Sequence, residues 1–268
     1  MSRIATRLLA LKSQGRKALI PYVMCGDPTL DITVPLMHQM VASGADVIEL
    51  GMPFSDPFAD GETIQLAGER ALRAGTNVRA VLQQVAIFRQ DDADTPVVLM
   101  GYLNPIEKLG YETFCEQAAS AGVDGLLLVD MPPEERSVVA EYCDRLGLDT
   151  VFLAAPTTVD ERLESIARET QGYLYYVSLK GITGSGALNL EEVEARVNHI
   201  RTLTDVPVMV GFGIKTGDQA RAIGAAADGV IVGSVLVQAM ADNEQTPENI
   251  PTAVGDLLAA IRTRMDEK

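Results

Sequence analysis

Short apolar runs alternate with amphipathic stretches along the whole chain. Near-continuous apolar runs of this length are typical of parallel strands that are covered by helices on one side and packed against one another on the other. We predict eight strands, at residues 18–24, 46–51, 96–101, 125–130, 150–154, 172–178, 207–211 and 229–233.

The stretches between these runs have the periodicity of helices. Leu190, Val193, Val197 and Ile200 share one helical face, and the segment from Thr158 to Glu161 has the pattern of a capping box. Eight strand-then-helix units favour a closed (β/α)8 TIM barrel, with residues 1–268 as one domain. Residues 1–17 and 247–264 predict an extra N-terminal helix and an additional C-terminal helix. An open doubly wound sheet is the alternative fold.

Composition narrows the class of protein. The apolar runs are far shorter than the ~20 residues of a membrane helix, and the N-terminus lacks the pattern of an export signal. A net charge of −15 argues against nucleic-acid binding, so an anionic ligand must be held by local dipoles. The three cysteines are scattered without metal-binding spacing. We therefore expect a cytoplasmic protein with reduced thiols.

The second predicted strand carries the most unusual residue. Side chains alternate along a strand, so Ile48 and Leu50 face the helices while Glu49 points into the barrel near its mouth. Loss of hydration there raises the pKa of a carboxyl group and suits it to proton transfer near neutral pH. The alternative is a structural Glu49 that bonds neighbouring polar groups. Asp56 and Asp60 lie in the loop that follows this strand, where they can converge with Glu49 on a small ligand.

Glycine-bearing segments follow the last three predicted strands, at residues 178–186, 211–215 and 233–234. Glycines let backbone N–H groups approach phosphate oxygens, and loops after strands seven and eight form the phosphate site of many barrels. The segment 180–186, centred on Thr183, has the character of a closing lid. Both histidines, His38 and His199, lie in predicted helices away from strand ends. No motif for a metal or nucleotide cofactor is present.

At these motifs the chain resembles the α subunit of tryptophan synthase over essentially its whole length. The matching segments are ALIPY and GDP near the start, ELGMPFSDPFADG with the following IQ, MGYLNP, LLLVDMPPEE, LAAPTT, SLKGITG, GFGI and VGS. The resemblance implies a (β/α)8 lyase that cleaves indole-3-glycerol phosphate to indole and glyceraldehyde 3-phosphate. It also implies a β-subunit partner that carries pyridoxal phosphate, in an α2β2 complex, and no cofactor or metal in this chain.

The resemblance also assigns roles, residue by residue. It implies that Glu49 and Asp60 are catalytic, with Glu49 transferring protons and Asp60 contacting the indole N–H. The remaining matches are Tyr22, Met100, Leu127, Leu153, Tyr175, Thr183 and Phe212 for substrate, Gly184, Gly213, Gly233 and Ser234 for phosphate, and Asp56, Pro57 and Asn104 for the β subunit. Four positions depart from the family pattern, namely Met24, Cys25, Phe58 and Glu62, and none of them removes a catalytic group.

Three other functions stay open at this point. A stand-alone indole-releasing lyase would need no partner, and a catalytically silent regulatory subunit would bind phosphate without turnover. A phosphosugar isomerase on the same scaffold is a further alternative, because fold alone does not fix chemistry.

Overall fold

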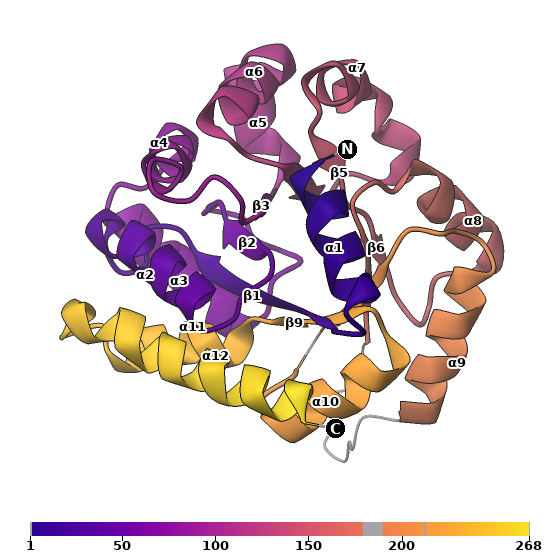
Figure 1. Cartoon of the computed structure of the whole chain (residues 1–268). Helices are drawn as coiled ribbons and strands as arrows, with labels where there is room; N and C mark the ends of the chain where they lie inside the picture. Colours follow the sequence, from indigo (N-terminus) through magenta and orange to yellow (C-terminus); the bar gives the residue numbers. More distant parts are fainter. Residues whose placement is uncertain (1, 179–189, 212, 268) are drawn as a thin grey trace.

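The computed structural model describes residues 2–178, 190–211 and 213–267. All strand pairs are parallel, and the sheet has the order β5-β4-β3-β2-β1-β9-β8-β7-β6 (Figure 1). The strands are β1 (Ala18–Met24), β2 (Ile48–Gly51), β3 (Val97–Gly101), β4 (Gly125–Leu128), β5 (Asp149–Thr150), β6 (Leu153–Ala154), β7 (Leu174–Val177), β8 (Val208–Gly211) and β9 (Gly229–Val232).

The sheet closes on itself through β5 and β6, which together occupy the place of the predicted strand at 150–154. β5 pairs with β4, and β6 pairs with β7. Between them, Val151 N donates to Leu126 O at 2.9 Å and Tyr175 N donates to Phe152 O at 3.0 Å. The predicted strand is therefore present but interrupted. The eight-stranded closed barrel is confirmed, and the open sheet is wrong.

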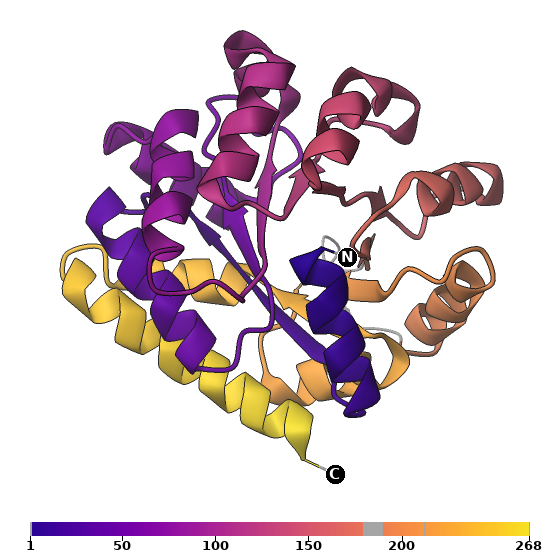
Figure 2. The ribbon, with the colours of Figure 1, turned by 45° about the horizontal axis from the view of Figure 1, so that its top comes forward.

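Helices surround the barrel (Figure 2). The α-helices of the described residues are α1 (Arg3–Ser13), α2 (Leu30–Ala42), α3 (Glu62–Arg73), α4 (Val78–Phe88), α5 (Leu103–Leu109), α6 (Tyr111–Ala121), α7 (Ser137–Leu146), α8 (Asp160–Glu169), α9 (Leu190–Arg201), α10 (Gly217–Ala226), α11 (Ser234–Asp242) and α12 (Ile250–Asp266). Short 3-10 turns, η1 (Pro133–Glu135) and η2 (Pro247–Asn249), precede α7 and α12. The expected C-terminal helix is α12, which packs against α2 and α10.

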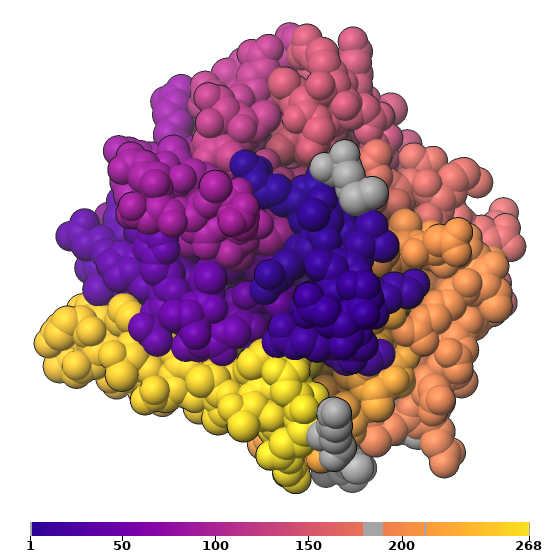
Figure 3. All heavy atoms as spheres, viewed as in Figure 1, coloured from indigo at the N-terminus to yellow at the C-terminus, as the bar shows by residue number. Residues whose placement is uncertain are grey.

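The expected N-terminal helix, α1, packs across one end of the barrel (Figure 3). Its buried Ile4, Leu8 and Leu11 join the cluster inside the barrel, to which Val47 also belongs, whereas Ile48 lies in the separate cluster beneath the helices. Burying one such aliphatic side chain contributes about 1.5–3 kcal/mol. The N-terminal ends of the strands are thus covered, which leaves the opposite end for a ligand.

In the described part of the chain, no helix combines the length and apolar character that a membrane span requires.

Candidate active site

Glu49 points into the barrel, as the alternation along β2 predicts. Its side chain is fully buried, and the Tyr173 hydroxyl donates a hydrogen bond of 2.5 Å to Glu49 Oε1. Glu49 Oε2, equally buried, has no hydrogen-bond partner among the described residues. Buried polar atoms are nearly always paired, so an unpaired carboxyl oxygen requires an explanation. A Glu49 with a purely structural role would have hydrogen bonds at both carboxyl oxygens. A carboxyl oxygen without a hydrogen bond is suited to receive or deliver a proton.

Burial raises the pKa of Glu49 to about 7, and the hydrogen bond from Tyr173 opposes this rise. Loss of hydration disfavours the charged form, whereas a donated hydrogen bond favours it. The two effects leave Glu49 able to exist as acid and as carboxylate near neutral pH. A group of this pKa can both give and take a proton at little cost in free energy.

The hydrogen bond from Tyr173 lowers the pKa of Glu49, so removal of the hydroxyl should raise that pKa. In Tyr173→Phe the carboxylate loses its hydrogen-bond donor, so we expect the pKa of Glu49 to rise further. The limb of the pH profile of kcat/KM that reports Glu49 should move to higher pH. Profiles of the wild type and of Tyr173→Phe test this. A limb that stays in place, or moves to lower pH, would contradict the assignment.

The same pKa predicts how folding stability depends on pH. The folded-state pKa of Glu49, about 7, lies above its ordinary value of 4.5. Between these pH values the Glu49 side chain is deprotonated in the unfolded chain but still protonated in the folded chain. The free energy of unfolding therefore falls as pH rises, and the full loss is reached above pH 7. Glu49→Gln should remove this cost. We expect the variant to gain up to about 3 kcal/mol in free energy of unfolding over wild type at pH 8, with no comparable gain at pH 4.5. Urea titrations at both pH values measure it, and an equal gain at both would refute it.

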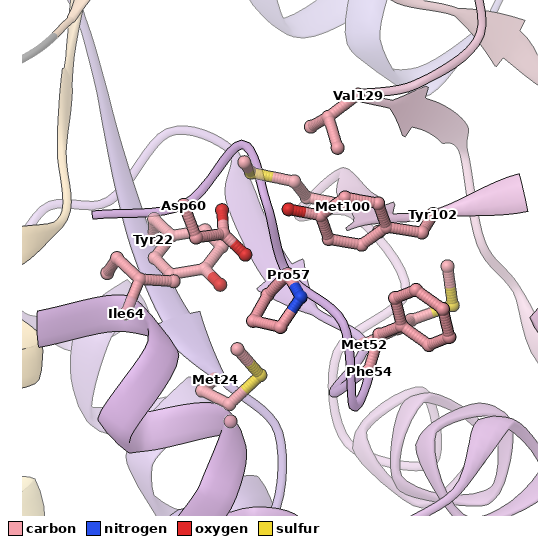
Figure 4. A pocket seen from close by; sticks show the side chains of 12 residues that line it. Tyr22, Met24, Met52, Phe54, Pro57, Asp60, Ile64, Met100, Tyr102 and Val129 are labelled. Atoms are coloured by element: carbon pink, nitrogen blue, oxygen red, sulfur yellow. The ribbon is translucent and has the colours of Figure 1, made fainter. Parts of the chain in front are cut away.

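Asp60 lies in the loop between β2 and α3, where it lines a small cavity at the mouth of the barrel (Figure 4). Its carboxyl group lies between the side chains of Tyr22 and Tyr102. Burial raises the pKa of Asp60, and a hydrogen bond from Tyr102 lowers it. Tyr102 also accepts a hydrogen bond of 3.1 Å from Ala59 N, which holds the loop against β3.

Tyr22 is a neighbour of both acids. It is paired with Glu49 across β1 and β2, and it lines the cavity that holds Asp60. Burial is the main cause that raises the pKa of Tyr22, and the charges of Asp60 and Glu49 raise it further. Gly51 makes room for this ring, because a Cβ at that position would lie 2.4 Å from the Tyr22 hydroxyl. Glu49 does not line the cavity itself, and Tyr22 is the residue that connects its strand position to the cavity that holds Asp60.

The cavity among the described residues holds about 10 Å³, which is room for about one water molecule. An indole ring therefore enters only if side chains or the Asp60 loop move. The aromatic rings of Phe54 and Phe58 pack on Tyr102, with centroids 5.2 and 5.5 Å away, and of these two Phe54 lines the cavity.

The predicted substrate-binding residues divide into three groups. Tyr22 and Met100 line the cavity. Leu127 belongs to the cluster inside the barrel, and Leu153 and Tyr175 pack against it beside Tyr173. Thr183 and Phe212 lie outside the described residues.

Several cavity residues were not predicted from the sequence. They include Met24, Phe54, Ile64, Tyr102 and Val129. Tyr173, the partner of Glu49, was missed as well. Its signal was present, because alternation in the predicted strand at 172–178 gives Tyr173 and Tyr175 the same direction.

The predicted phosphate residues lie at the ends of the last two strands. Gly213 is exposed with a φ of 74°, a conformation that favours glycine. Gly233 caps the N-terminus of α11, and half-buried Ser234 is the first residue of that helix. Backbone N–H groups at a helix N-terminus attract anions. Gly184, the fourth predicted phosphate residue, lies outside the described residues.

The predicted partner-binding residues lie on two segments that contact each other. Asp56 is exposed and Pro57 half-buried in the Asp60 loop, and Asn104 is exposed near the start of α5. The bond from Ala59 to Tyr102, just before α5, joins these segments. Phe58, one of the four departures from the family pattern, is 71% exposed beside them. Over residues 2–178, 190–211 and 213–267, no group of three or more His, Cys, Asp or Glu gathers as a metal site.

Comparison with known proteins decides the family. The family model described as "Tryptophan synthase alpha chain" matches residues 8–263. The chain belongs to the tryptophan synthase alpha chain family. It is 56% identical over 266 residues to the tryptophan synthase alpha chain of Marinobacter nauticus, covering 99% of this chain and 98% of that one.

Solved structures of this family have the same fold. The crystal structure of tryptophan synthase subunit alpha from Legionella pneumophila is similar with a TM-score of 0.93 and 46% identity, covering 99% of both chains. A tryptophan synthase structure from Mycobacterium tuberculosis has a TM-score of 0.85 and 34% identity, covering 98% of this chain and 99% of that chain.

Proposed function

We propose that Glu49 and Asp60 carry the lyase reaction of this tryptophan synthase α subunit. The reaction is the cleavage of indole-3-glycerol phosphate to indole and glyceraldehyde 3-phosphate. The observation that carries the proposal is the unpaired, buried Oε2 of Glu49, on a carboxyl group whose pKa is about 7.

Glu49 serves both proton transfers of a retro-aldol cleavage. The protonated carboxyl group gives its proton to C3 of the indole, which places a positive charge on the ring. The resulting carboxylate takes the proton of the side-chain hydroxyl next to C3. The hydroxyl oxygen becomes the aldehyde carbonyl, and the electrons of the broken carbon–carbon bond return to the ring. The new C–H bond stays on indole, and Glu49 regains its proton.

Asp60 stabilises the positive charge that develops during this step. Its carboxylate accepts a hydrogen bond from the indole N–H. The carboxylate is available for this because it faces the cavity, beside Tyr22 and Tyr102. A fixed negative charge beside a developing cation favours the transition state more than the ground state. Tyr22, Met100, Leu127, Leu153, Tyr175, Thr183 and Phe212 contact the rest of the substrate.

The phosphate group binds at the opposite rim, at Gly184, Gly213, Gly233 and Ser234, where the α11 N-terminus supplies the local positive potential that an acidic chain otherwise lacks. Asp56, Pro57 and Asn104 contact the β subunit, which in this family holds the pyridoxal phosphate while the α chain carries no cofactor. We also assign residues 1–268 to one domain and the enzyme to the cytoplasm, where amino-acid biosynthesis takes place.

An indole-release assay with indole-3-glycerol phosphate, run with and without the β subunit, tests the proposal. We expect slow cleavage by the chain alone and a large increase in the complex. Full activity without the partner would support a stand-alone lyase instead. Absence of indole under both conditions would support a silent regulatory subunit.

A further inference from the structure

A buried ion pair joins α3 to the loop that follows β1, beside the candidate active site. Arg70 Nε donates to Asp27 Oδ1 at 2.7 Å, and Arg70 Nη2 donates to Asp27 Oδ2 at 2.8 Å. The Asp27 side chain is fully buried, and that of Arg70 is 9% exposed. Two parallel charge-assisted bonds fix an orientation as well as a distance.

The position of α3 sets the position of Asp60. The helix begins at Glu62, directly after the Asp60–Gly61 turn. In its first turn, Gln65 Nε2 donates to Asp60 O at 2.8 Å. Any shift of α3 relative to the barrel therefore moves Asp60.

The opposite wall of the cavity belongs to β1, through Tyr22 and Met24. Apolar contact between α3 and β1 is made by Ala67 and Ala71, which pack with these two residues, and by the larger Ile64 at the edge of the same cluster. Apolar contacts are non-directional, so they fix the orientation of a helix less sharply than hydrogen bonds do. The Arg70–Asp27 pair adds two directional bonds between α3 and the loop after β1.

We propose that Arg70, bonded to Asp27, is a positioning residue for the cleavage reaction. It holds α3, and through α3 the Asp60 loop, in a defined position beside Tyr22. This inference rests on the proposed role of Asp60.

A matched control lies at the other end of the barrel. Arg89 Nη2 donates to Asp124 Oδ2 at 2.7 Å, and the two side chains are 10% and 4% exposed. The Asp124 carboxylate also accepts from Val97 N at the start of β3. This pair resembles Arg70–Asp27 in burial and bond length but lies at the end of the strands that is remote from the active site.

The test compares Arg70→Lys with Arg89→Lys in the complex with the β subunit. Lysine keeps the positive charge but loses the two-bond fork of Arg70 to Asp27, and it loses the bonds that Arg89 makes to backbone carbonyls beside its bond to Asp124. Both variants should have a lower Tm than wild type. At a temperature well below both Tm values, Arg70→Lys should lower kcat for cleavage about 10- to 100-fold with a smaller change in KM, because small displacements of a reacting group cost this much. Arg89→Lys should keep kcat within about twofold.

Wild-type kcat in Arg70→Lys, or an equal loss in Arg89→Lys, would overturn the inference. A double-mutant cycle tests whether the effect of Arg70 on kcat passes through Asp60. If Arg70 acts through Asp60, Arg70→Lys should add little loss to Asp60→Asn, whereas a fully additive loss would refute it. If Arg70→Lys does not fold, Asp27→Asn, which keeps the shape of the carboxylate, tests the same pair. Failure of the wild type to cleave would instead refute the proposed function.

Discussion

Glu49→Gln should abolish most indole production while the substrate still binds. Gln keeps the shape of the side chain and its bond to Tyr173 but cannot take or give a proton. A general acid–base residue contributes about 10²- to 10⁴-fold to a rate, and Glu49 serves both proton transfers, so we expect a loss toward the upper end. Single-turnover indole release at saturating substrate measures it.

Substrate affinity provides the control for this variant. Because the proposed phosphate site does not include Glu49, we expect the Kd for indole-3-glycerol phosphate to change little. The variant should also be more stable than wild type at pH 8, which shows that the loss is not one of folding. Turnover within tenfold of wild type would remove Glu49 from the reaction.

The sequence predicts the direction of Glu49 because strand alternation is a local property. Val47 in the barrel interior and Ile48 under the helices confirm that alternation. It does not predict which residue meets Glu49 across the barrel, since Tyr173 is 124 positions away and their contact follows from closure of the sheet. The Arg70–Asp27 pair was missed because it joins α3 to a loop 43 positions away, a contact that local periodicity does not specify.

Helix ends show where a local pattern misleads. The predicted capping box at Thr158 is wrong, because α8 begins at Asp160 and its cap residue, Val159, makes no side-chain bond. Thr158 Oγ1 instead accepts from Ala155 N, which stabilises the turn after β6. The capping box of α10, from Thr216 to Gln219, is present although it was not predicted. A Thr can bond backward or forward along the chain, and the tertiary position of the loop decides which.

The positions of side chains that lie in loops are equally hard to predict. The sequence placed Asp60 near Glu49 but gave no sign that Tyr102 would lie against it, because Tyr102 follows β3 and reaches across to the loop after β2. The cavity therefore has two aromatic rings in its lining, Phe54 and Tyr102, that the sequence did not predict.

Asp60→Asn should be the second most damaging substitution. The amide can still accept the indole N–H through its oxygen, but it no longer provides the negative charge that opposes the developing cation. Loss of one such electrostatic contact costs about 10²- to 10³-fold in kcat. We expect kcat to fall by this amount with a smaller change in KM, because the charge develops only in the transition state.

The pH profile distinguishes this role from proton transfer. Asp60→Asn should keep the limb that reports Glu49, whereas Tyr173→Phe moves that limb with a smaller loss of rate. Met100→Leu is the control, since Met100 lines the cavity and the substitution changes the shape of the cavity without changing its charge, so it should cost far less in kcat. If Asp60→Asn raises KM and leaves kcat unchanged, Asp60 binds the indole ring equally in ground and transition states and does not stabilise the cation.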